Sequence, residues 1–104
     1  MFNWDDFING KVGVSFEEKD EVSLFLKMIE EKGLKLVAVY DAYINAIFSY
    51  GYHYIFHDPI GMKCYTAVSK NMFKYVVTYK EVFNINYPSE TKLMEFLEAW
   101  YGKI

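Results

Sequence analysis

The first third of the chain shows two regular patterns of apolar and polar residues. From Lys11 to Phe16 the two kinds alternate strictly, which is the period of a strand with one buried face. Acidic residues follow, and then apolar residues recur at the spacing of one helical face: Val22, Phe25, Leu26 and Ile29. Ser15 and Glu18 have the spacing of a capping box for this helix, and Gly33 suits its C-terminal end. The patterns therefore predict a strand followed by a helix between residues 11 and 33.

The next part of the chain is expected to continue the sheet. The apolar run from Leu34 to Tyr40 is typical of a central strand covered on both faces. Residues 41–51 fit two structures, because Asp41 suits the N-terminus of a short helix while Tyr43 and its neighbours also suit a strand. We slightly favour a strand or irregular structure there.

Turn residues divide the remaining strands. Residues 52–57 and 63–68 predict a hairpin, since the sequence Asp58-Pro59-Ile60-Gly61 between them is typical of a turn. A further strand is expected over residues 73–78, and a capped turn begins at Thr78 and includes Glu81.

A last helix is predicted from Ser89 to Trp100, with Gly102 ending it. The resulting fold class is α+β, a mostly antiparallel sheet with helices on one face, in the approximate order β-α-β-β-β-β-α. The whole chain, residues 1–104, is expected to be one domain.

Composition narrows the class of protein. Hydrophobic residues make up 53% of the chain, which indicates a folded globule with one modest core. The formal net charge is −3 and the chain contains no Arg, so binding to duplex nucleic acid is not expected. The sequence has no basic N-terminal region before an apolar run and no apolar stretch of membrane-spanning length, so we expect neither a secretory signal nor a membrane segment.

The groups that most often carry chemistry do not form a recognisable motif. His53 and His57 would lie roughly 13 Å apart along a strand, too far to bind one metal ion, and are expected on the sheet surface. Cys64 is expected to be a small buried side chain rather than a nucleophile. We therefore expect no catalytic residue, no metal ligand and no cofactor.

An unusual share of aromatic residues, 20% of the chain, supplies the main candidate for a binding site. Tyr50, Tyr52, Tyr54 and Phe56 share one parity, so one face of a strand could carry four rings in a row. With Tyr43 and the cations of a locally basic region they form the predicted site: Tyr43, Tyr50, Tyr52, Tyr54, Phe56, Lys63, Lys70 and Lys74. The rings could be core residues under the helices, a protein interface or a platform that stacks on a nucleobase. Because so many rings are hard to bury in one small domain, we also expect a homo-oligomer.

The opening of the chain resembles a known group of proteins. Trp4, Phe7, Gly10-Lys11 and Val12-x-Val14, with Gly33-Leu-Lys35 after the helix, are similar to small accessory proteins of phages and prophages of low-GC Gram-positive bacteria. A second match is the segment Phe73–Phe83. The resemblance covers roughly residues 4–35 and 73–83 and implies action in the host cytoplasm, often against host defences.

Two kinds of function follow as expectations. The first is a non-enzymatic phage-encoded protein that binds and modulates a host protein, such as a component of antiviral defence. The second is a small-ligand binder that sequesters a nucleotide immune signal. An uncharacterised enzyme is a third hypothesis, which no residue pattern supports.

Overall fold

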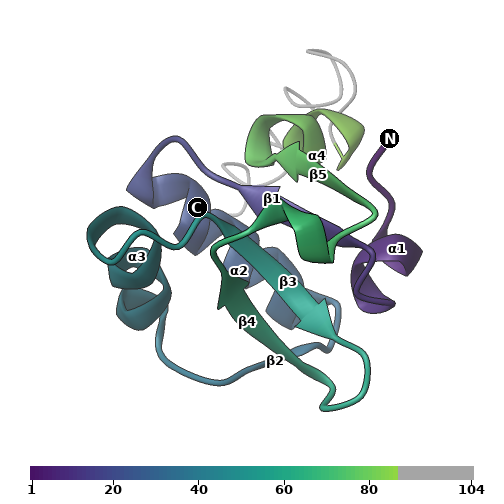
Figure 1. Ribbon diagram of the computed structural model, residues 1–104, viewed down its shortest axis with the longest axis horizontal. Coiled ribbons are helices and arrows are strands. Elements are labelled where there is room, and N and C mark those ends of the chain that lie inside the picture. Colours follow the sequence, from purple (N-terminus) through teal and green to yellow (C-terminus); the bar gives the residue numbers. More distant parts are fainter. Residues whose placement is uncertain (87–104) are drawn as a thin grey trace, which may run out of the picture.

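The computed structural model describes residues 1–86, which form a five-stranded sheet with helices packed mainly against one side (Figure 1). In chain order the helices and strands are α1 (Trp4–Ile8), β1 (Val12–Ser15), α2 (Lys19–Glu31), β2 (Lys35–Leu36), α3 (Tyr40–Ser49), β3 (Tyr54–Asp58), β4 (Lys63–Ala67), the short 3₁₀ helix η1 (Lys70–Met72), β5 (Tyr75–Thr78) and α4 (Tyr79–Asn86). The α+β class is confirmed. The predicted last helix lies outside the described residues.

The sheet is mixed, so the prediction of a mostly antiparallel sheet was wrong. Its strand order is β2-β4-β3-β1-β5. The β3–β4 hairpin and the β1–β3 pair are antiparallel, whereas β1 pairs with β5 and β2 pairs with β4 in parallel. Each parallel pair joins strands separated by other elements, because parallel neighbours need a crossover connection. The turn predicted at residues 58–61 joins β3 to β4 as expected.

Strand pairing defines two faces of the sheet, since residues paired across strands point to the same side. One face, which we call the inner face, packs against α1, α2 and the first turn of α4. Its buried residues are Val12, Val14, Ile55, His57, Cys64 and Val77. The opposite side is the outer face, formed by Gly13, Ser15, Lys35, Tyr54, Phe56, Asp58, Lys63, Tyr65, Ala67, Val76 and Thr78.

The core receives its rings from the N-terminal segment and the helices. Phe25 of α2 lies in the middle of this cluster, stacked with Trp4 at 6.0 Å and edge-on to Phe7 at 5.4 Å between ring centroids. The helical spacing in the sequence predicted this face of α2 correctly: Val22, Phe25, Leu26 and Ile29 are all buried. Burying such side chains against the sheet is the main source of stability in a domain of this size.

The start of α2 differs from its prediction by three residues. Glu18, not Ser15, is the N-cap, and the backbone N–H groups of Glu17 and Glu18 both donate to the carboxylate of Glu21. Ser15 belongs to β1, where its hydroxyl donates to the carbonyl of Val77. The capped turn predicted at Thr78 is confirmed, because the N–H of Glu81 donates to the Thr78 hydroxyl as α4 begins.

Most of the segment 41–51 belongs to α3, which ends at Ser49, so the slight preference for a strand was wrong. The partly or fully buried residues of this helix recur at helical spacing: Tyr40, Tyr43, Ile44 and Ile47. Because α3 begins at Tyr40, the strand predicted from Leu34 to Tyr40 is shorter than expected. Strand β2 has two residues and lies at the edge of the sheet, whereas a long central strand was predicted.

Candidate interaction surface

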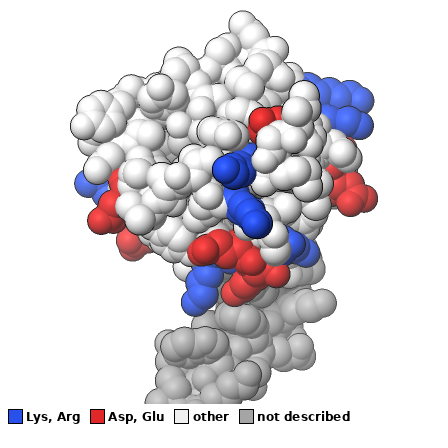
Figure 2. Space-filling model, turned by 90° about the horizontal axis from the view of Figure 1, so that it is seen from below, with Lys and Arg blue, Asp and Glu red and all other residues white. Residues whose placement is uncertain are grey.

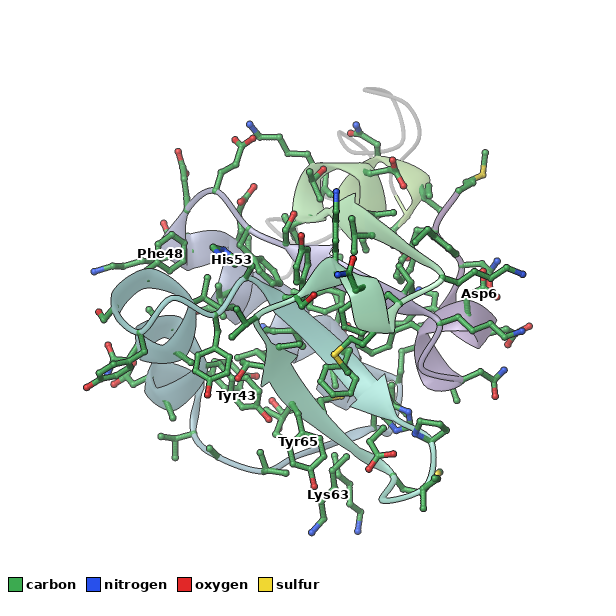
Figure 3. The ribbon with its side chains drawn as sticks, viewed as in Figure 1. Asp6, Tyr43, Phe48, His53, Lys63 and Tyr65 are labelled. Carbon is green, nitrogen blue, oxygen red and sulfur yellow. The ribbon has the colours of Figure 1, made fainter. Side chains whose placement is uncertain are left out.

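Aromatic side chains gather on the outer face of the sheet, on strands β3 and β4. Phe56 and Tyr65 are cross-strand partners, with ring centroids 6.2 Å apart and planes tilted by 34°. Tyr54 and Phe56 are half-buried, and Tyr65 is 37% exposed. Figure 3 shows Tyr65 and Lys63 following one another along β4. These rings are held on rigid strands, which fixes their positions better than a loop would.

One segment crosses the outer face and covers part of it. Residues 68–74, including η1, lead from β4 to β5 in front of the sheet (Figure 1). Phe73, only 9% exposed, lies on Gly13 so closely that a Cβ atom there would stand 2.5 Å from its ring. The same ring packs on Phe56 at 5.4 Å and Tyr54 at 5.8 Å. The absence of a side chain at Gly13 therefore makes room for the aromatic cluster.

Charged residues lie at the end of this cluster nearest the β3–β4 turn. Lys35 and Lys63 are partners in the parallel β2–β4 pair, so two ammonium groups occupy the same face of neighbouring strands. Asp58 is the partner of Lys63 on the other side, but its carboxylate accepts from the N–H of Ile60 in the turn. Neither lysine has an acid within ion-pair distance among the described residues. The ion pair found in residues 1–86 joins Lys80 to Glu17.

A groove lies beside the outer face, between β4 and α3. It has a volume of about 360 Å³ and is lined by Val37, Ala38, Ala42, Tyr43, Ala46, Tyr52, Tyr65 and Thr66. Tyr43 holds its two walls together, because its hydroxyl accepts from the N–H of Val37 at 3.0 Å and donates to the carbonyl of Cys64 at 2.6 Å. Val37 directly follows β2, so this hydroxyl lies where the chain leaves the sheet and the groove begins. Burial raises the pKa of Tyr43.

The structure brings some of the predicted binding residues together and separates others. Tyr54, Phe56 and Lys63 lie on the outer face. Lys70 is exposed in η1 and Lys74 is exposed at the end of the crossing segment. Tyr43, in contrast, is 3% exposed and belongs to the core.

The predicted row of four rings does not exist. Tyr50 is 74% exposed at the C-terminal cap of α3 and Tyr52 lies in the following loop, because β3 begins at Tyr54. Tyr52 instead lines the groove beside Tyr65. The predicted strand began two residues too early, at Tyr52, in the segment that follows α3. The alternation of faces expected of a strand therefore does not apply to Tyr50 and Tyr52.

Three residues of this surface were missed. Tyr65 follows from the predicted turn, since closing the hairpin at residues 58–61 sets Phe56 opposite Tyr65. Phe73 was placed in a strand, and its position over Gly13 depends on the crossing connection. Lys35 meets Lys63 only through the parallel β2–β4 pair, for which the local pattern holds no signal.

Of the two histidines and the cysteine, His57 and Cys64 are buried as cross-strand partners on the inner face. His57 is buried, which corrects its expected place on the sheet surface: its ring Nδ1 lies 2.6 Å from the carbonyl of Ile8, the last residue of α1. That carbonyl is one of the helix-end acceptors that need a partner outside the helix. Cys64 is buried as predicted, and burial raises the pKa of its thiol to about 12. Within residues 1–86 no cluster of three or more acidic, His or Cys side chains is suited to hold a metal ion.

Comparisons with protein-family models, curated proteins and solved structures find no match to this chain. None of the helices within the described residues has the length and apolar character needed to span a membrane.

Proposed function

We propose that this chain is a non-enzymatic binding protein that docks another protein against its outer face. One observation carries the proposal: ten of the thirteen large apolar side chains exposed in the described part lie between residues 37 and 72. Tyr65 lies on the outer face itself, and the other nine belong to the segments around it from the end of β2 to η1: Val37, Val39, Phe48, Tyr50, Tyr52, Ile60, Met62, Val68 and Met72. Apolar side chains concentrated in one region are typical of interaction sites.

The shape of the surface favours a protein partner. The aromatic cluster is broad and backed by strands, and a few aromatic anchors dominate the affinity of most protein interfaces. Tyr65 at the centre and Ile60 at the exposed turn are the two side chains best placed to act as anchors. Neither touches the inner core, so the fold does not require them.

The biological setting of the proposal comes from the resemblance to phage and prophage accessory proteins. In that setting the partner is a host protein in the host cytoplasm, and a component of antiviral defence is the kind of target that such proteins often counter.

A nucleotide-sequestering protein is the second candidate, favoured by the groove beside Tyr65. Its volume of about 360 Å³ falls within the range of small-molecule sites, roughly 300–1,000 Å³. However, its lining has no charged side chain, and the nearest lysines, Lys35 and Lys63, lie outside it. A phosphate would therefore gain little from the groove itself.

Site-specific crosslinking tests the main proposal. A photoreactive amino acid replaces Tyr65 in one variant and Leu24, exposed on α2, in another, and each full-length chain is expressed in a low-GC Gram-positive host. We expect a defined protein to crosslink at position 65 and not at position 24. The captured protein is then purified, and its affinity is measured for the unmodified chain.

Matched truncations decide whether the contact is specific. Tyr65→Ala with Ile60→Ala should weaken binding at least thirty-fold, about 2 kcal/mol or more, as expected for the loss of interface anchors. The control pair Leu24→Ala with Ile85→Ala removes similar apolar groups from α2 and α4 and should leave binding unchanged. Equal losses in both pairs would contradict the proposal. A nucleotide mass retained in native mass spectrometry, without a protein partner, would favour the second candidate.

A further inference from the structure

The acidic residues of this molecule lie mainly on its helical side, whereas its lysines are found on both sides. The acidic residues of the described part lie on or next to helices, apart from one, Asp58. The first turns of α1 and α2 are acidic, and α2 ends in two glutamates. Seen from the hairpin end, the upper part of the surface is a broad area without charged side chains, and both acidic and lysine side chains lie in its middle, lower part and sides (Figure 2).

The strands show the opposite balance. The charged residues on the five strands are Lys35, Lys63 and Asp58, all on the outer face. Like charges directly opposite each other on neighbouring strands destabilise a sheet, so the Lys35–Lys63 pair has an energetic cost. The crossing segment adds two more exposed lysines, Lys70 and Lys74. A chain with a net charge of −3 therefore carries a locally basic outer surface.

We propose that the outer face recognises an extended acidic segment of its partner protein, in which an acidic and an apolar residue are two positions apart. This inference rests on the proposed function and specifies the chemistry of the partner. Lys63 and Tyr65 are themselves two residues apart on β4, a distance of roughly 7 Å. Side chains on one side of an extended ligand recur at the same interval, so its carboxylate can meet Lys35 and Lys63 while its apolar group enters the groove beside Tyr65.

The arrangement of the rings argues for a peptide over a single-stranded nucleic acid. Stacking platforms present flat ring faces on which successive bases lie. Here Phe73 is tilted by 57° to Phe56 and by 71° to Tyr54 and covers both, so those ring faces are used inside the protein. The chain also has no Arg, the residue that best recognises phosphate. Carboxylates paired with ammonium groups around an apolar anchor fit this surface better.

Labelled synthetic peptides provide the test. One repeats the unit Glu-Thr-Tyr-Thr, which sets acid and ring two positions apart. A second of equal length replaces every Glu by Lys, and a thymidine oligonucleotide serves as a nucleic-acid probe. Fluorescence anisotropy with the full chain should show at least about ten-fold tighter binding of the acidic peptide than of the basic peptide. Amide NMR shifts should map that binding to β3 and β4.

Charge reversal provides the matched control. Lys35→Glu with Lys63→Glu should weaken the acidic peptide about ten-fold or more and strengthen the basic one. Lys19→Glu with Lys27→Glu, on exposed positions of α2, gives the same net charge and should change neither affinity more than about two-fold. Circular dichroism confirms that both double variants remain folded.

Each other outcome overturns the inference in a recognisable way. Equal affinity for both peptides, or no binding up to their solubility limit, would show that the outer face does not select an acidic segment. Oligonucleotide binding that Lys35→Glu with Lys63→Glu abolishes makes the ligand a nucleic acid. If reversal instead abolishes self-association in sedimentation, the occupant is the acidic helical side of a second copy. If the host partner loses affinity with Tyr65→Ala and Ile60→Ala but not with charge reversal, the inference fails and the proposed function stands.

Discussion

The two faces of one sheet use aromatic residues in opposite ways. On the inner face the strands contribute mostly aliphatic side chains such as Val14 and Ile55, and most rings come from the N-terminal segment and the helices. On the outer face the strands themselves carry the rings, Tyr54, Phe56 and Tyr65, and Phe73 from a connection packs on the first two.

The difference shows that a high aromatic content need not mean a large core. An inner face of small aliphatic residues lets large rings from helices approach the strands closely, so the core stays densely packed. Rings on the outer strands add little to that core and remain partly in contact with water. Such a face keeps an energetic incentive to be covered, as expected of a binding surface.

The largest expected effect separates the two faces by stability. Phe25→Ala should lower the free energy of unfolding by about 3–5 kcal/mol, because the ring is fully buried among Trp4 and Phe7. Tyr65→Ala should cost about 1 kcal/mol or less, since its ring is partly exposed on the outer face. Urea unfolding of both variants measures the difference. Similar losses would mean that the outer face is a second core.

A smaller effect is expected where the crossing segment meets the sheet. Gly13→Ala places a methyl group against the ring of Phe73 and should cost about 1–3 kcal/mol, as overpacking does. In the background of Phe73→Ala the same substitution should cost well under 1 kcal/mol, because the obstructing ring is gone. A double-mutant cycle by chemical unfolding measures this coupling. Additive losses would show that Phe73 does not cover Gly13.

Local patterns predicted the elements whose residues meet their neighbours through short connections. The alternation around Val12 gave β1, the apolar spacing around Phe25 gave α2, and the Pro-Gly turn gave the hairpin. Helix α3 has its buried residues at helical spacing too, but its Tyr and Ile side chains also favour strands, so the pattern alone did not decide.

The candidate surface was only partly predictable for a different reason. Tyr54, Phe56 and Lys63 were recognised because their place in the hairpin depends on local sequence. Lys35 and Phe73 reach the surface through a parallel pair and a crossing connection, which are properties of the whole fold. Residues brought together by such non-local contacts leave no periodic signal in the chain.

The boundary between the faces can be tested through Tyr43. Tyr43→Phe removes a hydroxyl that joins Val37 to Cys64 and should cost about 1–2 kcal/mol, since a buried carbonyl and an N–H lose their partner. Tyr65→Phe should cost less than about 0.5 kcal/mol, because the side chain is partly exposed and Phe keeps the ring that packs on Phe56. Thermal unfolding compares the two variants. A neutral Tyr43→Phe would mean that its hydroxyl does not hold the groove together.

The smallest expected effect is a gain in stability at the hairpin turn. Met62 has a φ of 59°, in the left-handed region that favours glycine, so Met62→Gly should stabilise the fold by up to about 1 kcal/mol. Differential scanning calorimetry measures the gain. Met62 and Ile60 are both exposed at this turn, which ends the outer face beside Lys63. If the strained methionine is kept because it contacts a partner, the stabilised variant should bind the crosslinked protein more weakly. Unchanged binding with higher stability would mean that Met62 is not part of the contact surface.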